Sequence, residues 1–193
     1  KTATKLSSKK IVIFASGSGS SAENIILTFK NKSDIVVTKL YCNNPDAFVL
    51  QRIKKYNIEA LVFNSEELNN GFVMRDLNKI SPDLIVLAGF LKKIPENIIH
   101  SFNNKIINIH PSLLPKYGGK GMYGLNVHKS VIKNNDSESG FTIHYVNKDY
   151  DEGSIIFQKT IKVGADDPQT LAKKVLIEEH KYYPEIIKKI LYD

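Results

Sequence analysis

The segment Ile11-Val12-Ile13-Phe14-Ala15-Ser16-Gly17-Ser18-Gly19-Ser20-Ser21 decides the fold of this chain. Its first five residues are apolar, and three of them are β-branched, which favours a buried strand. The serines and glycines that follow predict a tight loop, and residues 22–30 carry the pattern of a helix. Strand, small-residue loop and helix in this order predict the first part of a β-α-β unit.

The same alternation continues as far as residue 109. Further strands are predicted at 35–41, 60–63, 83–88 and 105–109, and further helices at 46–56, 66–80 and 95–102. The strand at 83–88 is apolar on both faces, as a central parallel strand should be. We therefore expect an α/β fold with a doubly wound, mostly parallel sheet and right-handed crossovers.

The pattern changes after Pro115. The segment 117–124 is too rich in glycine for regular structure, and we expect a mobile loop there. A helix is predicted at 124–133, two strands at 141–146 and 154–163, and a closing amphipathic helix at 172–191. Because a turn-rich segment separates the two strands, we expect an antiparallel strand pair toward the C-terminal end.

Length and composition limit the class of protein. The chain has 193 residues, 42% of them hydrophobic, which suits one domain with a substantial core. The first residue is Lys and not Met, so we expect a disordered or vector-derived tail at 1–9 and a single domain at 10–193. Cys42 is the only cysteine, which excludes an internal disulfide and fits a reducing cytoplasm.

The formal net charge of +7 does not by itself indicate nucleic-acid binding. Four lysines lie in the tail ahead of the first predicted strand, and the other basic residues are interleaved with acidic ones along the predicted helices. A modest positive surplus is better suited to small anionic substrates. No apolar run approaches the roughly 20 residues that a membrane-spanning helix needs, so we expect no membrane contact.

The loop at 16–21 predicts an anion site. Its glycines let the backbone approach a ligand, and the free amides of the following helix N-terminus favour a phosphate. It lacks the Gly-Lys-Ser/Thr of a P-loop, and Ala22 occupies the third glycine position of a dinucleotide fingerprint, so a monophosphate ester is expected. The alternative is a helix start without a ligand, because Ser20 and Glu23 have the spacing of a capping box.

The segment Asn108-Ile109-His110-Pro111 sets an amide and an imidazole at the end of a predicted strand. Side chains alternate along a strand, so Asn108 and His110 should project to the same side. An amide that donates to a developing oxyanion, beside an imidazole that titrates near neutral pH, suits acyl transfer to an amine. Asp151 is a further candidate, because a carboxylate beside His110 would raise the imidazole pKa. The alternative for Asp151 is a turn-forming acid.

Together these motifs resemble those of the folate-dependent formyltransferases. The resemblance is carried by Ser16–Ser20, Ala88–Phe90, Asn108–Pro115 and Asp151–Gly153, and it extends from about Ile11 to the end of the chain. It implies a Rossmann-like formyltransferase fold. Within the superfamily the chain is most similar to members that transfer the formyl group of 10-formyltetrahydrofolate directly to the amine of glycinamide ribonucleotide, in de novo purine biosynthesis.

The resemblance also implies roles for individual residues. Asn108 would hydrogen-bond the oxyanion, protonated His110 would stabilise it, and Asp151 would support His110 and assist proton transfer through water. Two further sets match binding residues: Gly19, Ser20, Ser21 and Glu179 for the phosphate and ribose, and Leu91, Lys92, Ile94 and Asn108 for the folate. No metal is expected, because none of the histidines is accompanied by cysteines or closely spaced carboxylates.

The chain departs from the family pattern in three places. Ser21 stands where the family commonly has Asn, although serine can still donate a hydrogen bond. Asn126 stands where many members have a histidine. The segment 118–124 is longer than usual, and it could be a lid over the folate or a mobile loop without function.

The sequence leaves further functions open. Methionyl-tRNA formyltransferases, sugar-nucleotide formyltransferases and 10-formyltetrahydrofolate deformylases are related, but the first and the last carry an additional domain, for which we expect no room here. The sequence is also compatible with a catalytically silent nucleotide-binding module or a basic nucleic-acid-binding protein. We favour a cytoplasmic enzyme, monomeric or homodimeric, whose partners are glycinamide ribonucleotide and folate.

Overall fold

Strand β1 (Lys9–Ala15) is central to the first sheet of the computed structural model, which describes residues 7–193. Its last five residues are fully buried, as their apolar character predicted. Strands β2 (Ile35–Cys42) and β4 (Leu84–Leu87) pair with it on either side, both in parallel. Strand β3 (Glu59–Val62) pairs with β2 in parallel, so the order is β3-β2-β1-β4.

The chain divides into two compact units, Lys1–Phe90 and Leu91–Asp193. The parallel sheet belongs to the first unit. Residues 1–6 of the predicted tail lie outside the described part of the chain, whereas Lys9 already belongs to β1. The single domain predicted for residues 10–193 stays a prediction.

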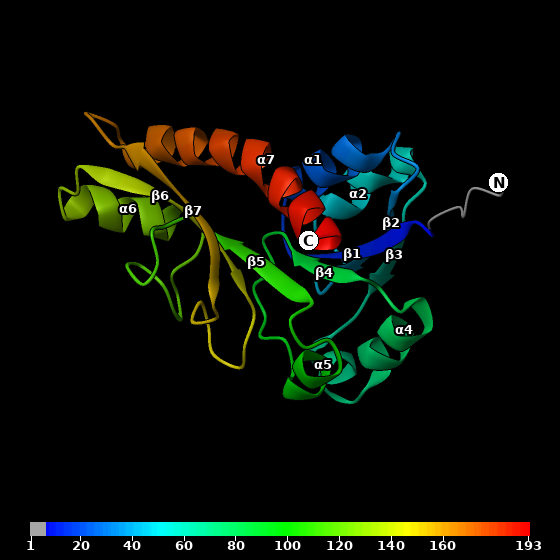
Figure 1. Ribbon diagram of the computed structural model, residues 1–193. Helices are drawn as coiled ribbons and strands as arrows, with labels where there is room; N and C mark the ends of the chain where they lie inside the picture. The colour runs from blue at the N-terminus through cyan, green and yellow to red at the C-terminus, as the bar shows by residue number, and fades with distance from the viewer. Residues whose placement is uncertain (1–6) are drawn as a thin grey trace. The chain divides into compact units, whose positions relative to one another are not determined.

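In the first unit, helices join the parallel strands on both faces of the sheet. Helix α1 (Ser20–Phe29) connects β1 to β2, and α2 (Val49–Ile53), extended by the 3-10 turn η1 (Lys54–Tyr56), connects β2 to β3. Helices α3 (Ser65–Asn69) and α4 (Phe72–Ile80) connect β3 to β4. Figure 1 shows α1 and α2 on one face of this sheet and α4 on the other, which is the doubly wound arrangement that the sequence predicted.

Two helices of the first unit differ in extent from their predictions. The helix predicted at 66–80 is divided between α3 and α4, because Gly71 between them has a φ of 89° and leaves the helical conformation. The helix predicted at 46–56 begins only at Val49. Before it, the Asn44 side chain accepts a hydrogen bond from the Asp46 amide at 3.0 Å, which forms a turn in place of the first helical turn.

The second unit contains a three-stranded antiparallel sheet. Helix α5 (Glu96–Ser101) precedes β5 (Ile106–His110), and α6 (Leu125–Lys133) precedes β6 (Glu138–Tyr145). Strand β6 pairs with β5 on one side and with β7 (Ile155–Lys162) on the other. The β6–β7 pair was predicted. The antiparallel pairing of β5 with β6 was not, because a loop and a helix separate the two strands in sequence.

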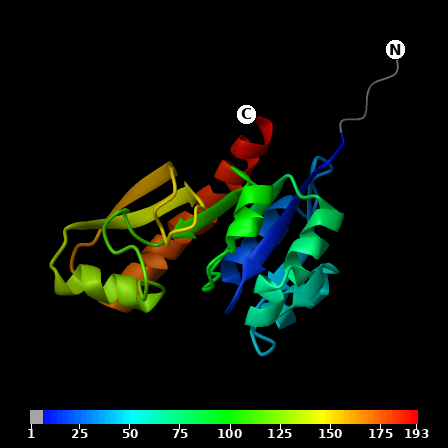
Figure 2. The same cartoon turned by 90° about the horizontal axis from the view of Figure 1, so that it is seen from below.

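Helix α7 (Pro168–Tyr192) runs along the antiparallel sheet and contacts β6, β7 and α6 (Figure 2). Asp167 caps its start by accepting a hydrogen bond from the Thr170 amide at 2.7 Å, and Pro168 occupies the first helical position. Its buried residues recur every four positions and include Leu171, Val175, Glu179, Tyr183 and Ile187. Glu179 is the exception in this otherwise apolar or aromatic stripe.

Candidate active site

Strand β5 carries Asn108 and His110 on the same face, as the alternation of side chains predicted. The antiparallel register places Asn108 opposite His144, and His110 opposite Thr142 of β6. His110, Thr142 and His144 are 4%, 0% and 2% exposed, and Asn108 is half-buried. Two neighbouring strands therefore bring four polar side chains to one largely buried patch of the sheet.

His144 holds the Asn108 amide in one orientation. Its Nδ1 lies 2.9 Å from the Tyr145 carbonyl oxygen, which can only accept, so Nδ1 carries a proton. In the tautomer with its proton on Nδ1, Nε2 is an acceptor, and it lies 3.2 Å from Nδ2 of Asn108. The Asn108 amide thus donates one N–H to His144 and keeps a second N–H for another acceptor.

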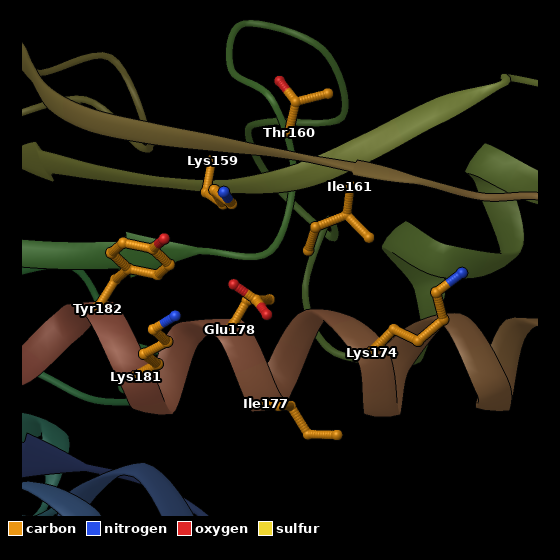
Figure 3. Close-up of a pocket in the computed structure, with 8 residues that line it drawn as sticks. All are labelled: Lys159, Thr160, Ile161, Lys174, Ile177, Glu178, Lys181 and Tyr182. Atoms are coloured by element: carbon orange, nitrogen blue, oxygen red, sulfur yellow. The ribbon is translucent and has the colours of Figure 1, made fainter.

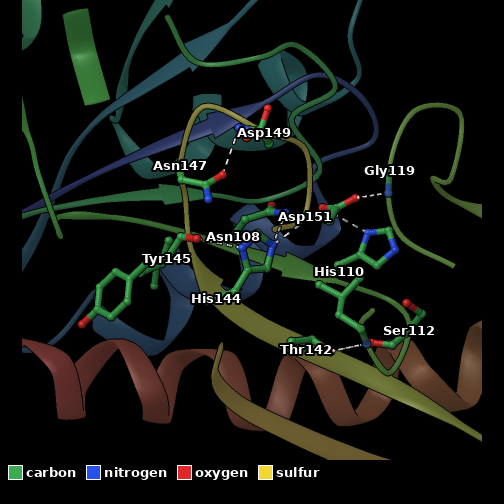
Figure 4. Close-up of polar contacts among 12 residues, drawn as sticks. Asn108, His110, Ser112, Gly119, Thr142, His144, Tyr145, Asn147, Asp149 and Asp151 are labelled. Atoms are coloured by element: carbon green, nitrogen blue, oxygen red, sulfur yellow. Dashed lines mark hydrogen bonds and ion pairs between the residues drawn. The ribbon is translucent and has the colours of Figure 1, made fainter. Parts of the chain in front are cut away.

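Asp151 lies between the two imidazoles, as Figure 4 shows. Its Oδ1 is 3.6 Å from Nδ1 of His110 and 3.6 Å from Nε2 of His144. Its Oδ2 accepts a hydrogen bond from the Gly119 amide at 3.0 Å. The predicted trio is therefore assembled in the second unit, together with a second histidine.

Gly153 explains how the loop that carries Asp151 can lie so close to the sheet. A Cβ at this position would lie 1.5 Å from the Tyr145 carbonyl oxygen, so no side chain fits. Asp151 itself has a φ of 56°, in the left-handed region that aspartate tolerates better than most residues. The Asp-x-Gly pattern thus reflects close backbone packing beside the carboxylate and not a simple solvent-exposed turn.

The predicted influence of Asp151, which raises the pKa of His110, is present but is not the largest one. Burial lowers the pKa of His110, and this effect exceeds the opposing influence of the Asp151 carboxylate and the Tyr117 carbonyl. For Asp151, burial alone would raise the pKa, but the two imidazoles and the Gly119 amide hold it below its usual value. The resting state at neutral pH is a neutral His110 beside an ionised Asp151.

The start of the glycine-rich segment fixes the histidine and the aspartate. The Tyr117 carbonyl accepts a hydrogen bond from Nε2 of His110 at 2.7 Å, which assigns the proton of the neutral ring to Nε2. Gly118 packs so closely on Leu114 that a Cβ would lie 2.7 Å from its Cδ2 atom. Residues 117–119 therefore orient His110 and Asp151 through their backbone.

Tyr117 is anchored in turn by the residues that follow α6. Its hydroxyl donates to Asp136 Oδ2 at 2.7 Å and accepts from Asn134 Nδ2 at 2.8 Å. Lys116 forms an ion pair with the same Asp136 carboxylate at 3.0 Å. The first residues of the glycine-rich segment are thus held by hydrogen bonds of their backbone and by contacts of the Lys116 and Tyr117 side chains with Asp136.

In the first unit, the predicted phosphate loop lies between β1 and α1. Gly19 is buried with a φ of 78°, and a Cβ there would lie 2.2 Å from Cγ2 of Val49. Helix α1 begins at Ser20, so Ser20 and Ser21 occupy the first turn, as an anion site requires. Ser20 and Glu23 do not form a capping box, because Gly19 is the N-cap residue, no side chain caps the helix, and Glu23 pairs with Arg52.

The loop after β1 also lies at the switch point of the parallel sheet. The chain winds from β1 toward β2 and β3 on one side, and returns to β4 on the other. The Ser16 amide donates to the Gly89 carbonyl at 3.0 Å, which joins the loops that follow β1 and β4. Ligands of open α/β sheets bind at such a point.

Glu179 is buried on α7, with 8% of its surface exposed. Burial raises its pKa to about 8, so the carboxyl group is mostly protonated at neutral pH. Within the described residues, no hydrogen bond or ion pair to its side chain is formed. A protonated carboxyl group can both donate and accept, which suits the ribose hydroxyls predicted as its ligand.

The predicted folate residues lie in the segment that opens the second unit. Leu91 is 49% exposed and Lys92 is exposed, whereas Ile94 is 6% exposed. Nζ of Lys93 lies 4.8 Å from the centre of the Tyr150 ring, so this segment contacts the loop that carries Asp151. Leu91 and Lys92 are open to a ligand, and the role of Ile94 in a pocket wall stays a prediction.

Comparison with known proteins identifies the family. The family model described as formyl transferase matches residues 9–187 of the chain. The chain belongs to the formyl transferase family. This formyl transferase is 34% identical to the phosphoribosylglycinamide formyltransferase of Bacillus subtilis over 190 residues, which cover 95% of each chain.

Two further relatives have the same name. The chloroplastic phosphoribosylglycinamide formyltransferase of Arabidopsis thaliana is 40% identical over 189 residues, covering 93% of this chain but 64% of the plant protein. The chain thus spans less than two thirds of the length of that relative. The crystal structure of phosphoribosylglycinamide formyltransferase from Bacillus halodurans superimposes with a TM-score of 0.85 at 33% identity, over 96% of both chains, which confirms the predicted fold.

Three contributions to this formyl transferase site were missed in the sequence. His144 was considered only as a possible metal ligand, although the alternation of Phe141 and Ile143 with Thr142 and His144 predicts a polar face on this strand. The backbone groups of Tyr117 and Gly119 left no signal, because the identity of a side chain does not report where its carbonyl or amide points. The pairing of β5 with β6 places His144 beside Asn108, and the folded loop places the Tyr117 and Gly119 backbone groups beside His110 and Asp151.

Other groups of the formyl transferase lie outside this arrangement. His128 is buried on α6 with no hydrogen-bond partner for Nδ1 among the described residues, and burial lowers its pKa. A pocket of about 470 Å³ lies between β7 and α7. Figure 3 shows the residues that line it, Lys159, Lys181 and Tyr182 among them. None of the predicted site residues lines it. Across residues 7–193 no cluster of three metal-ligating side chains occurs, and no helix there has the length and apolarity to span a membrane.

Proposed function

We propose that this protein transfers the formyl group of 10-formyltetrahydrofolate to the amine of glycinamide ribonucleotide, in de novo purine biosynthesis. The observation that carries the proposal is the convergence of the Asn108 amide, the His110 imidazole and the Asp151 carboxylate in one partly buried patch. The names of the relatives in Bacillus subtilis and Arabidopsis thaliana support the same substrates. A location in the cytoplasm and a monomeric or homodimeric state remain part of this proposal.

Asn108 would act on the formyl oxygen. As the acceptor amine attacks the formyl carbon, the oxygen becomes negatively charged, and the Asn108 N–H that His144 leaves available can donate to it. The hydrogen bond to His144 keeps that donor from rotating away. Orientation of one donor before the reaction is what distinguishes a preorganised site from the same amide in water.

His110 and Asp151 would manage the proton that the amine releases. Neutral His110 has its proton on Nε2, so Nδ1 is free to accept, and it faces Asp151 Oδ1. When His110 takes up the proton on Nδ1, the Asp151 carboxylate would stabilise the imidazolium, and the imidazolium charge would stabilise the developing oxyanion. Breakdown of the tetrahedral intermediate cleaves the bond to the folate nitrogen, which receives the proton, and no covalent enzyme intermediate is needed.

The substrate residues supply binding in this proposal. Gly19, Ser20 and Ser21 would hold the phosphate at the start of α1, and the protonated Glu179 would bind the ribose. Leu91, Lys92 and Ile94, together with Asn108, would contact the folate. No metal is assigned a role.

An absorbance assay with 10-formyltetrahydrofolate tests the function. We expect folate turnover that requires glycinamide ribonucleotide and that falls only at acidic pH, below the usual range of a histidine, because burial lowers the pKa of His110 and a protonated His110 cannot accept the proton. Folate loss without the acceptor would instead identify a hydrolase. Absence of turnover with and without acceptor would exclude the transferase and favour the binding module.

A further inference from the structure

The phosphate loop of the first unit is fastened to α2 by three contacts. The Val49 amide donates to the Gly17 carbonyl at 3.1 Å, and Nε of Arg52 donates to the Ser18 carbonyl at 2.7 Å. Gly19 packs directly on Val49. Successive residues of the loop are therefore attached to one short helix, and Arg52 provides the only charged donor among these contacts.

Arg52 is itself fixed on its other side. Its Nη1 atom lies 2.6 Å from Oε2 of Glu23, and its guanidinium stacks 5.0 Å from the centre of the Phe48 ring. Oε1 of the same carboxylate accepts from Lys55 Nζ and from the Tyr56 hydroxyl, both at 2.7 Å. The guanidinium thus joins the loop before α1 to a carboxylate on the first turn of α1.

The position of Glu23 makes this arrangement relevant to phosphate binding. A carboxylate in the first turn favours the helix N-terminus on its own, but it repels a dianionic phosphate at the same end. Arg52 and Lys55 both contact Glu23, so two positive charges offset one negative charge. The low pKa of Glu23, about 2, agrees with a carboxylate that stays ionised within this group.

We propose that Arg52 is a positioning residue for the phosphate of the ribonucleotide. It holds the Ser18 carbonyl, and with it the loop that presents Gly19, Ser20 and Ser21, and it neutralises Glu23 so that a phosphate is not repelled. The inference deepens the proposed function and depends on it. Arg52 touches the loop and not the reacting atoms, so its effect should fall on binding of the phosphorylated acceptor and leave folate binding unchanged.

Steady-state kinetics of four variants tests this role. Arg52→Ala should raise KM for glycinamide ribonucleotide by about tenfold, the size expected for one hydrogen bond from a charged donor, with an unchanged KM for the folate. Arg52→Ala combined with Glu23→Gln should lower this KM again, to about threefold above that of wild type, because the double variant lacks the Glu23 carboxylate that Arg52 no longer neutralises. Arg52→Lys should give an intermediate KM, since lysine keeps the positive charge but has one nitrogen donor, whereas the guanidinium uses two nitrogens.

The matched control is Lys54→Ala. Lys54 lies two residues beyond Arg52, is exposed, and has no side-chain contact within the described residues, so the variant removes the same charge without touching the loop. An unchanged KM for the ribonucleotide in both Arg52 variants would overturn the proposal, as would equal increases for both substrates. If Arg52→Ala does not fold, Arg52→Lys decides alone.

Wild-type turnover separates this inference from the proposed function. If wild type does not use glycinamide ribonucleotide, the proposed function fails. If wild type is active and the ribonucleotide KM of the Arg52 variants equals that of wild type, only the positioning role fails.

Discussion

The two glycine-rich loops of this protein require glycine for different physical reasons. In the loop before α1, Gly19 has a positive φ and also lacks room for a Cβ, because Val49 lies against it. In the segment 117–124, Gly119, Gly121 and Gly124 have positive φ values, but a Cβ on any of them would meet nothing within 4 Å. The first loop therefore needs its glycine for packing, whereas the second needs these glycines only for backbone conformation.

The second loop is also uneven along its length. Its first residues bind His110 and Asp151 through backbone groups, and Tyr117 is attached to Asp136. Beyond Gly119 these attachments give way to open space around the glycines. The comparison indicates that glycine content alone does not identify a mobile lid, because the first residues of this loop are hydrogen-bonded to His110 and Asp151. Movement of the remainder stays a prediction.

The largest expected effect is in the catalytic trio. His110→Ala and Asp151→Asn should each lower kcat by roughly 10²–10⁴, the range for loss of a positioned acid or base, while thermal unfolding stays close to that of wild type. Single-turnover kinetics with saturating substrates measures the chemical step. A reduction of less than about threefold in both variants would remove the assigned roles.

Gly19→Ala compared with Gly121→Ala tests the difference between the loops. The first substitution forces a Cβ into Val49 and should destabilise the protein by roughly 1–3 kcal/mol and raise KM for the ribonucleotide. The second has open space and should cost only about 1 kcal/mol of backbone strain. Chemical denaturation and steady-state kinetics provide both values, and equal losses of stability would contradict the comparison.

Tyr117→Phe tests the attachment of the second loop. It removes the hydroxyl bonded to Asp136 and Asn134 but keeps the carbonyl that binds His110. We expect kcat to fall by roughly three- to tenfold, because the carbonyl is less well fixed, with an unchanged KM for the ribonucleotide. Tyr123→Phe in the same loop is the control, since Tyr123 is 52% exposed and its hydroxyl has no partner among the described residues. Equal kcat values for the two variants would show that the anchor is irrelevant.

The smallest expected effect is on the acid stability of the first loop. The pKa of Glu23 is about 2 in the folded protein, below its ordinary 4.5, so its ion pairs contribute stability above about pH 4.5 that is lost as pH falls toward 2. Glu23→Gln should therefore be less stable than wild type by up to about 1 kcal/mol near neutral pH, and the difference should vanish near pH 2. Urea denaturation across this range gives the values, and a constant difference would argue against the ion pairs.

Much of the fold follows from local patterns. The apolar runs at β1 and β4 and the small residues at 16–19 predicted a parallel, doubly wound sheet, because burial on both faces requires such runs. Helix ends were less accurate where a single residue decides them, as Gly71 does between α3 and α4. The paired projection of Asn108 and His110 was predictable from strand alternation alone.

The electrostatics of the site were not predictable in the same way. A neighbouring Asp151 favours a protonated His110, but burial has the larger and opposite effect, and burial depends on every element packed around the ring. Likewise, Ser20 and Glu23 match a capping box in sequence, yet Arg52, Lys55 and Tyr56 compete for the Glu23 carboxylate in the folded chain. The spacing of residues in the sequence identifies candidate interactions, and the tertiary contacts determine which of them form.

The sequence by itself determined the order of strands and helices, and it predicted the phosphate-type loop and the candidate residues Asn108, His110 and Asp151, because these depend on residue type and spacing. The tertiary structure alone decided that His144 orients Asn108, that the backbone of residues 117–119 orients His110 and Asp151, and that Arg52 contacts the loop before α1. These contacts join residues distant in sequence, or backbone groups that have no residue-specific signal. They form only when packing of the complete sheets and helices fixes their distances.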